Sequence, residues 1–352
     1  MLELWEINQT SSPSSSSHVE DFRLLYIFGG CHQQDIRMLC GLRPSAALLR
    51  PATALRVLPH AARGLATAAD AKQKPPLIEK SLDDGVLTLT FSNEKKLNAW
   101  TMPLMKQLFT SLDEAAAADD VKGVVITGSG KYYSAGVDLS SMIQPMAPAK
   151  LVREIRNSNE KCFGMFLNFP KPIVAAVNGP AIGAAVTSTV LMDSVIASES
   201  ASFSLPFAKL GVPPEGCSSV TWPERLGDES AQRMLGPENW TPSGVEAHAV
   251  GLVDELVPPD ALVARAVAKV RERIAAGGGR RFDAAESARL NKVNAEESAT
   301  LANAFVSPKF LNAMYDFNTK RGKSQLKAVF WLAKTTLPLW QPAKIVPSYD
   351  EK

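Results

Sequence analysis

KPIVAAVNGPAIGAA, at residues 171–185, is the stretch that decides the fold. Within it, Ile173–Val177 is a continuous apolar run, which is typical of a strand buried on both faces. The Asn-Gly-Pro sequence at 178–180 predicts a turn, because glycine and proline interrupt regular structure. The small residues that follow predict a buried helix from Ile182. Each apolar piece of residues 173–192 is too short to cross a bilayer, so no integral membrane span is expected.

Strands and helices alternate around this stretch. Apolar spacing predicts strands at 85–91 and 123–127. Helical spacing covers 97–118, where Thr101 suits the N-cap position before Pro103 in the first turn. Three more helices are expected, at 151–166, 261–276 and 284–303. The alternation predicts an α/β fold in which successive strands are parallel.

Composition excludes several classes of protein. The 352 residues are 45% hydrophobic and 21% charged, as in a globular protein. Lys and Arg number 38 against 36 Asp and Glu, a net charge of +2, so no basic field for nucleic acid is expected. The four cysteines are too scattered for a disulfide framework or a zinc site, and no metal site is expected. His18, His32 and His60 all precede residue 66, and His248 alone follows, which argues against chemistry built on several histidines.

Residues 1–75 are expected to be an N-terminal extension and linker. From Met38 to residue 69 there is no acidic residue, and arginines alternate with Leu and Ala, as in a mitochondrial presequence. Arg63, two residues before a leucine, resembles a processing site, which places the presequence at about 38–65, with Met38 as the working start. The expected location is the mitochondrial matrix; a disordered basic tail is the alternative interpretation, and the peroxisome is the alternative compartment, although the C-terminal YDEK is not a Ser-Lys-Leu-type signal.

Five segments together resemble the crotonase (enoyl-CoA hydratase/isomerase) superfamily. They are LNA at 97–99, SAGVDL at 134–139, KPIVAAVNGPAIGAA at 171–185, LGVPPEGCSS at 210–219 and GLVDELV at 251–257. The resemblance covers about residues 77–320, and RLNKVNAEES at 289–298 is similar to the Δ3,Δ2-enoyl-CoA isomerase branch. It implies a crotonase (ClpP-like) spiral of ββα repeats over 76–258, a helical C-terminal region over 259–352, and assembly as a homotrimer or homohexamer.

The C-terminal residues 322–352 depart from the family and add a hydrophobic segment at 329–332. Two interpretations stay open for this extension. It docks on the helical region, or it contacts a membrane surface.

The resemblance implies that an acyl-CoA thioester is converted to an enolate whose oxygen is held by two backbone N–H groups. The implied donors are those of Val137 and Ala184, and removing such a donor costs about 3–4 kcal/mol of transition-state stabilisation. The other residues that the resemblance places at the CoA substrate are Lys96, Leu97, Ala99, Ser134, Ala135, Gly136, Asp138 and Gly183. Asp138 is also expected to brace the oxyanion turn through backbone hydrogen bonds.

Carboxylates distinguish the branches of the superfamily. The two glutamates of the hydratases correspond here to Thr187 and Phe207, neither of which can activate water. The isomerase glutamate corresponds to Glu215, within the apolar GVPPEG turn at 211–216, where desolvation would raise its pKa and strengthen it as a base. Dienoyl-CoA isomerases have a second acid at the position of Phe207. Glu215 is therefore expected to be the one catalytic residue, with no second acid nearby.

These expectations favour a Δ3,Δ2-enoyl-CoA isomerase of fatty-acid β-oxidation. Its substrate would be an acyl-CoA, and it would need no cofactor, because CoA arrives as part of the substrate. The alternatives are a dienoyl-CoA isomerase or a hydratase-like enzyme and, in another class, a non-catalytic scaffold or RNA-binding protein of the crotonase fold.

Overall fold

The computed structural model describes residues 75–139 and 147–340. The expected presequence at 38–65, with Met38 and Arg63, lies outside the described residues, and so does residue 341 onward. In the described part, no helix is both long enough and apolar enough to span a membrane.

The core of the described chain is a six-stranded sheet in the order β1-β2-β3-β4-β6-β8. The strands are β1 (Ile78–Asp83), β2 (Val86–Phe91), β3 (Gly123–Gly128), β4 (Ile173–Val177), β6 (Ser194–Ser198) and β8 (Glu255–Val257). Only β1 is antiparallel to its neighbour, since it forms a hairpin with β2; the pairs from β2 through β8 are parallel. The parallel α/β arrangement predicted from the alternation of elements is confirmed.

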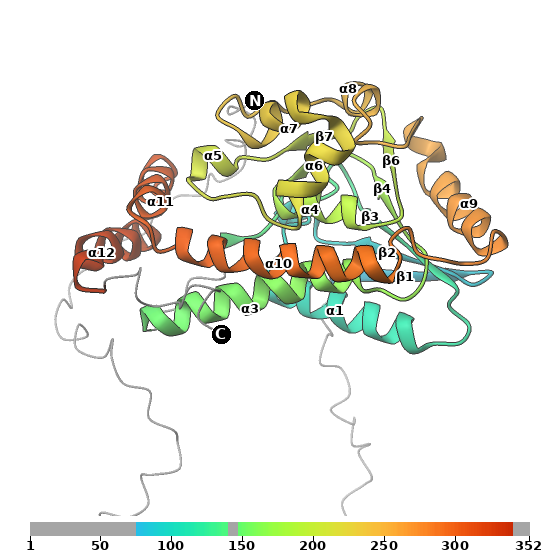
Figure 1. The fold of residues 1–352 in the computed structure, drawn as a ribbon, viewed down its shortest axis with the longest axis horizontal. Helices are drawn as coiled ribbons and strands as arrows, with labels where there is room; N and C mark the ends of the chain where they lie inside the picture. The colour runs from blue at the N-terminus through green and yellow to red at the C-terminus, as the bar shows by residue number, and fades with distance from the viewer. Residues whose placement is uncertain (1–74, 140–146, 341–352) are drawn as a thin grey trace, which may run out of the picture. The chain divides into compact units, whose positions relative to one another are not determined.

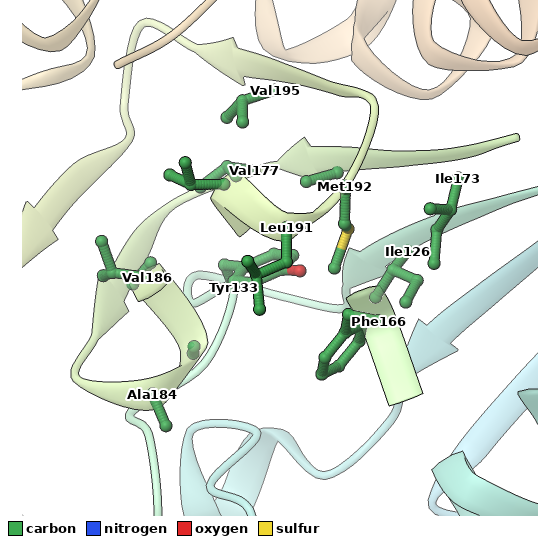
Figure 2. Packing of buried hydrophobic residues seen from close by; sticks show 14 of the residues in the cluster. Ile126, Tyr133, Phe166, Ile173, Val177, Ala184, Val186, Leu191, Met192 and Val195 are labelled. Carbon is green, nitrogen blue, oxygen red and sulfur yellow. The ribbon is translucent and has the colours of Figure 1, made fainter. Parts of the chain in front are cut away.

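Helices cover both faces of this sheet, which explains why its central strands are apolar throughout. On one face, Val125, Val174 and Ile196 pack against α9 (Leu262–Ala275) (Figure 1). The alternate residues of the same strands point into the main core, which α1 (Met102–Ala117) and α3 (Pro148–Leu167) cover. Figure 2 shows Ile126, Ile173 and Val195 among the side chains of this main core.

The segment after β4 differs from its prediction. Ile182 does not begin a helix; it ends the short strand β5 (Pro180–Ile182), which pairs in parallel with β7 (Ser202–Ser204) in a second, two-stranded sheet. The helix α4 covers only Ala184–Thr187 and continues as a 3-10 turn over Ser188–Leu191. The reason is that the backbone of Ile182 is already engaged in strand pairing.

The other helices surround the ends of the strands and form the C-terminal region. They are α5 (Phe207–Leu210), α6 (Ser218–Leu226), α7 (Asp228–Leu235), α8 (Gly244–Ala249), α10 (Ala284–Ala304), α11 (Pro308–Lys320) and α12 (Ser324–Trp340). Helix α10 lies beside α3 (Figure 1). The helices expected at 151–166, 261–276 and 284–303 are confirmed as α3, α9 and α10, and that expected at 97–118 begins only at Met102, after the N-cap Thr101.

The described part of the C-terminal extension docks on the helical region, one of the two interpretations left open by the sequence. Phe330 and Leu337 of α12 are buried against Phe310, Leu311 and Met314 of α11. The ring of Phe330 meets that of Phe310 edge to face, with centroids 6.3 Å apart.

Candidate active site

The turn at 134–137 is fixed by the loop that leads into α1. Ala135 N–H donates to the carbonyl of Leu97 at 2.9 Å, and Trp100 N–H donates to the carbonyl of Gly136 at 2.8 Å. These bonds run in opposite directions between the two segments, so each restrains the other. The first expected oxyanion donor therefore lies on a backbone that is anchored to a second stretch of chain.

Ser134 braces this turn from inside. Its side chain is fully buried; its Oγ donates to the carbonyl of Asn98 at 2.8 Å and accepts from Gly136 N–H at 3.1 Å. Asn98, also fully buried, has a left-handed φ of 53° and donates through Nδ2 to the carbonyls of Ser129 and Tyr132. Asparagine tolerates this backbone conformation better than most residues. The network gives Ser134 and Asn98 the task of setting the backbone geometry of the turn.

The second expected donor stands at the start of α4. Gly183 is the N-cap residue, with φ 60° and ψ −128°, a combination that glycine alone adopts without strain. Its N–H donates to the carbonyl of Ser204 at 2.8 Å, which ties it to the second sheet. A Cβ built on Gly183 would meet nothing within 4 Å, so the space in front of this residue is open. Ala184 follows as the first helical residue, where the N–H has no partner within the helix.

The two donor turns are in contact. A Cβ on Gly136, which has a φ of 77°, would collide with the carbonyl oxygen of Ile182, and Ile182 N–H donates to the carbonyl of Ser134 at 3.0 Å. Among the described residues, neither the N–H of Val137 nor that of Ala184 donates to an acceptor. Because backbone N–H groups in folded proteins are nearly always paired, two unpaired donors on adjoining turns suit an external acceptor such as a carbonyl oxygen.

The expected base, Glu215, is in a turn held in a tight conformation at both ends. Gly211 has a φ of 72° and Gly216 a φ of 65°, and a Cβ on Gly216 would lie 2.6 Å from the ring of Phe163. The Glu215 side chain is buried, with the residue only 8% exposed. Burial, with a smaller contribution from the negative charge of Glu297, raises the pKa of Glu215 to about 8. The desolvation that its apolar sequence suggested is present.

Glu297, on α10, is a second buried acid that the sequence analysis missed. The expectation of no second acid nearby is therefore wrong, since its charge acts on Glu215. Glu297 is 8% exposed and lies on the buried face of the helix with Leu290, Asn294 and Leu301. That four-three-four spacing was a signal in the sequence, because it places a glutamate on a face otherwise turned inward.

The positions at which hydratases have their glutamates are occupied as the sequence indicated. Thr187 is fully buried, and its Oγ1 donates to the carbonyl of Ala184 at 3.4 Å, within its own helix. Phe207 is buried in the main core together with Ala184. Neither position offers a group that titrates near neutral pH.

The remaining residues expected to contact CoA lie on the loop before α1 and directly after Val137. Leu97 and Ala99 are half-buried on the loop before α1. Asp138, directly after Val137, donates its N–H to the carbonyl of Trp100 at 3.2 Å, as expected for a residue that braces the turn. The Lys96 side chain is 60% exposed, and its Nζ lies 4.0 Å from Asp138 Oδ2. An exposed ammonium group at this position is suited to binding a phosphate group.

Each of these groups has the chemistry needed for one part of a proton removal next to a carbonyl. The two free N–H groups can take up the negative charge that develops on the carbonyl oxygen, and their rigid anchoring means that they need little rearrangement to do so. A carboxylate with a pKa near 8 is a stronger base than an ordinary glutamate.

The chain is similar to several known proteins. The family profile described as "Enoyl-CoA hydratase/isomerase" matches residues 81–314. Human "Enoyl-CoA delta isomerase 2" is 34% identical over 264 residues, which cover 68% of this chain and 63% of the human protein. Mouse "Enoyl-CoA delta isomerase 3, peroxisomal" is 32% identical over 260 residues, 69% of this chain and 78% of the mouse protein.

Solved structures share the fold. The enoyl-CoA hydratase/isomerase of Pseudoalteromonas atlantica T6c superimposes with a TM-score of 0.58 at 27% identity, covering 69% of this chain and 97% of the bacterial one.

Proposed function

The chain belongs to the enoyl-CoA hydratase/isomerase family, and we propose that within it the protein is a Δ3,Δ2-enoyl-CoA isomerase, which converts a 3-enoyl-CoA to the trans-2-enoyl-CoA. The observation that carries the proposal is the buried Glu215 carboxyl group, with its raised pKa, in a site where Thr187 and Phe207 replace the acids of hydratases. The names of the human and mouse relatives support the same reaction.

The proposed reaction needs one base that acts twice. The Glu215 carboxylate takes a proton from C2 of the 3-enoyl-CoA, and the electron pair moves through the thioester carbonyl to give a dienolate. The N–H groups of Val137 and Ala184 donate to the dienolate oxygen. Glu215 then returns the same proton to C4, the double bond stands between C2 and C3, and the carboxylate is regenerated. No atom is gained or lost, as an isomerisation requires.

Substrate binding would use the segments that form the donor turns. Lys96, Leu97 and Ala99 would contact the CoA portion, and Ala135, Gly136 and Gly183 would let the thioester approach the main chain closely. CoA enters as part of the substrate, and the proposed steps use no other cofactor. A trans-2-enoyl-CoA product suits fatty-acid β-oxidation. A homotrimer or homohexamer in the mitochondrial matrix, with the peroxisome as the alternative, completes the proposal.

The test is turnover of 3-hexenoyl-CoA by the purified protein, followed spectrophotometrically, with the Glu215→Gln variant beside it. The amide keeps the shape of the side chain and removes the base, so kcat should fall about 10³–10⁴-fold. Glu199→Gln, at an exposed position, is the matched control and should retain turnover. Hydration of 2-hexenoyl-CoA would favour a hydratase, turnover of a 3,5-dienoyl-CoA alone a dienoyl-CoA isomerase, and inactivity on all of them a non-catalytic protein.

A further inference from the structure

Three carboxylates are buried in the described part of the chain, those of Asp193, Glu215 and Glu297. Asp193 is neutralised by the guanidinium group of Arg280, 3.0 Å away. Glu297 forms no ion pair with any described residue. An ionised carboxylate without a cation is costly to bury, so its position calls for another source of stabilisation.

That source is the backbone beside Glu215. Glu297 Oε2 accepts from Cys217 N–H at 2.6 Å, and Oε1 accepts from Ser219 N–H at 2.8 Å. Cys217 is the N-cap residue of α6, and its side chain does not cap the helix. The Glu297 carboxylate therefore satisfies the N–H of Ser219, in the first turn of α6, which an N-cap side chain would ordinarily satisfy, and also the N–H of the N-cap residue itself.

The same turn carries the candidate base. Glu215 is two residues before Cys217, and its carbonyl accepts from Ser218 Oγ at 2.7 Å and from Ser218 N–H at 3.2 Å. Gly216 and Cys217, with φ values of 65° and 63°, are both left-handed. A left-handed conformation is strained for a residue other than glycine unless its surroundings hold it. At Cys217, the hydrogen bond from its N–H to Glu297 provides this support.

We propose that Glu297 is a positioning residue for Glu215: by binding the N–H groups of Cys217 and Ser219, it holds the turn that aims the base at C2 and C4 of the substrate. The proposal rests on the function given above. It makes the C-terminal helix α10 part of the catalytic apparatus, although Glu297 itself does not touch the substrate.

Electrostatics gives Glu297 a second effect on the same group. Its negative charge raises the pKa of Glu215, in addition to the larger effect of burial. The other ionisable groups around the pair are the thiols of Cys162 on α3 and Cys217, whose pKa values burial raises, and Arg289 and Glu286 on α10, whose charges act on Cys217 in opposite directions. Among these, Glu297 is the charged group that shifts the base.

The experiment compares Glu297→Gln with Glu296→Gln, the same change one residue earlier on the exposed face of α10, where Glu296 lies 3.9 Å from Lys292. The glutamine can accept from only one of the two N–H groups. In Glu297→Gln, kcat for 3-hexenoyl-CoA should fall about 10–100-fold, the size of effect that a misplaced catalytic group produces. KM should change little, because the expected CoA contacts lie on other segments. Glu296→Gln should match the wild type.

The pH profile separates positioning from simple loss of stability. The wild-type kcat/KM should rise with pH, and the midpoint of this rise should lie near pH 8, because Glu215 must be deprotonated to act. Removing the charge of Glu297 lowers the pKa of Glu215, so the midpoint in Glu297→Gln should move to lower pH. A variant with a lower melting temperature but the wild-type kcat and midpoint would show a purely structural role and overturn the proposal.

Glu297→Asp keeps the test open should the glutamine variant fail to fold. The aspartate retains the charge, so its midpoint should stay near that of the wild type, while its shorter side chain cannot span both N–H groups and kcat should still fall. Wild-type kcat in this variant would contradict positioning.

Amide hydrogen exchange supplies a readout that does not depend on the reaction. Exchange at Cys217 and Ser219 should be slow in the wild type and in Glu296→Gln, and at least about tenfold faster at one of the two in Glu297→Gln, because an unpaired amide exchanges more readily. If the wild type isomerises no enoyl-CoA, the proposed function fails, but the exchange rates still show whether Glu297 holds the N–H groups of Cys217 and Ser219. If the wild type is active and exchange is unchanged in Glu297→Gln, the positioning role fails alone.

Discussion

The two halves of the site are held in different ways. The donor turns at 134–137 and 182–184 are fixed by backbone hydrogen bonds to each other, to the loop before α1 and to strand β7. The turn of Glu215 is fixed by a side chain from α10, 80 residues away from Cys217 in the chain. The oxyanion site is thus a product of the core fold, whereas the base depends on the C-terminal helices.

This difference bears on how the family can vary. A backbone oxyanion site tolerates many side chains but few changes of backbone, because its geometry rests on glycines with positive φ. A base held by a remote carboxylate can be lost or moved without disturbing the sheet. We infer that substitutions in the donor turns should slow any enolate chemistry, and that substitutions around Glu215 should change its rate or pH dependence.

Within the donor turns, the largest effect is expected for Gly136→Ala. Its φ of 77° is unfavourable for alanine, and the added methyl group would collide with the carbonyl of Ile182, which forces the two donor turns apart. Misplacing one donor should lower kcat/KM about 10²–10³-fold, measured with 3-hexenoyl-CoA. Gly227→Ala is the matched control, because Gly227 has a φ of 78° but no atom within 4 Å of a built Cβ. Equal activity in the two variants would show that the contact between the turns is unimportant.

The next effect is the contribution of Glu215 to the pH dependence of stability. With a pKa near 8 in the folded protein against an ordinary value of 4.5, Glu215 binds its proton more tightly when folded. Its contribution is therefore most favourable below pH 4.5 and is lost as pH rises towards 8. Glu215→Gln removes this dependence, so its free energy of unfolding relative to wild type should rise by about 3–4 kcal/mol between pH 4.5 and 8. Denaturant titrations at several pH values measure it, and a pH-independent difference would contradict the buried, desolvated state of Glu215.

The sequence was informative where neighbours in the chain determine the structure. Ile173–Val177 is a strand with the predicted bounds, because a run of apolar residues before an Asn-Gly-Pro turn has few alternatives. Thr101 caps α1 as expected, since capping depends on residues three apart. The five family segments likewise singled out Val137, Ala184 and Glu215; the structure has Val137 and Glu215 outside the helices and Ala184 as the first residue of α4.

The sequence was uninformative where pairing across the fold decides. Ile182 is a strand residue because β7, which lies some twenty residues later, offers it a partner, and no local spacing reveals that. Glu297 could be assigned to the buried face of α10, but its partners Cys217 and Ser219 are known only once α10 is packed beside their turn. Tertiary contacts decided both cases.

The packing of α11 against α12 is expected to contribute to both stability and rate. Phe330→Ala should destabilise α11 and α12 by about 3 kcal/mol, because it empties a buried position against Phe310. Leu210 and Val212, shortly before Glu215, and Leu139, two residues after Val137, pack on the same cluster, so kcat should fall modestly. Phe317→Ala, at a position 41% exposed, should cost less than about 1 kcal/mol. A Phe330→Ala variant with wild-type thermal unfolding would mean that α12 adds nothing to the fold.

The smallest expected effect distinguishes the two regions by activity. Thr101 accepts from Leu104 N–H at the start of α1, and Ser307 accepts from Phe310 N–H at the start of α11, so Thr101→Ala and Ser307→Ala each remove one N-cap. Each variant should lose about 1 kcal/mol of stability, whereas Thr101→Ser, which keeps a capping hydroxyl, should keep the wild-type stability. Thr101 directly follows Trp100, whose N–H and carbonyl are both bonded to the donor turn, whereas Ser307 lies beyond α10. If the donor turns are held from the core, as their hydrogen bonds indicate, kcat should fall more in Thr101→Ala than in Ser307→Ala. Equal falls in the two variants would mean that general loosening of the protein, and not the anchoring of the oxyanion turn, limits the rate.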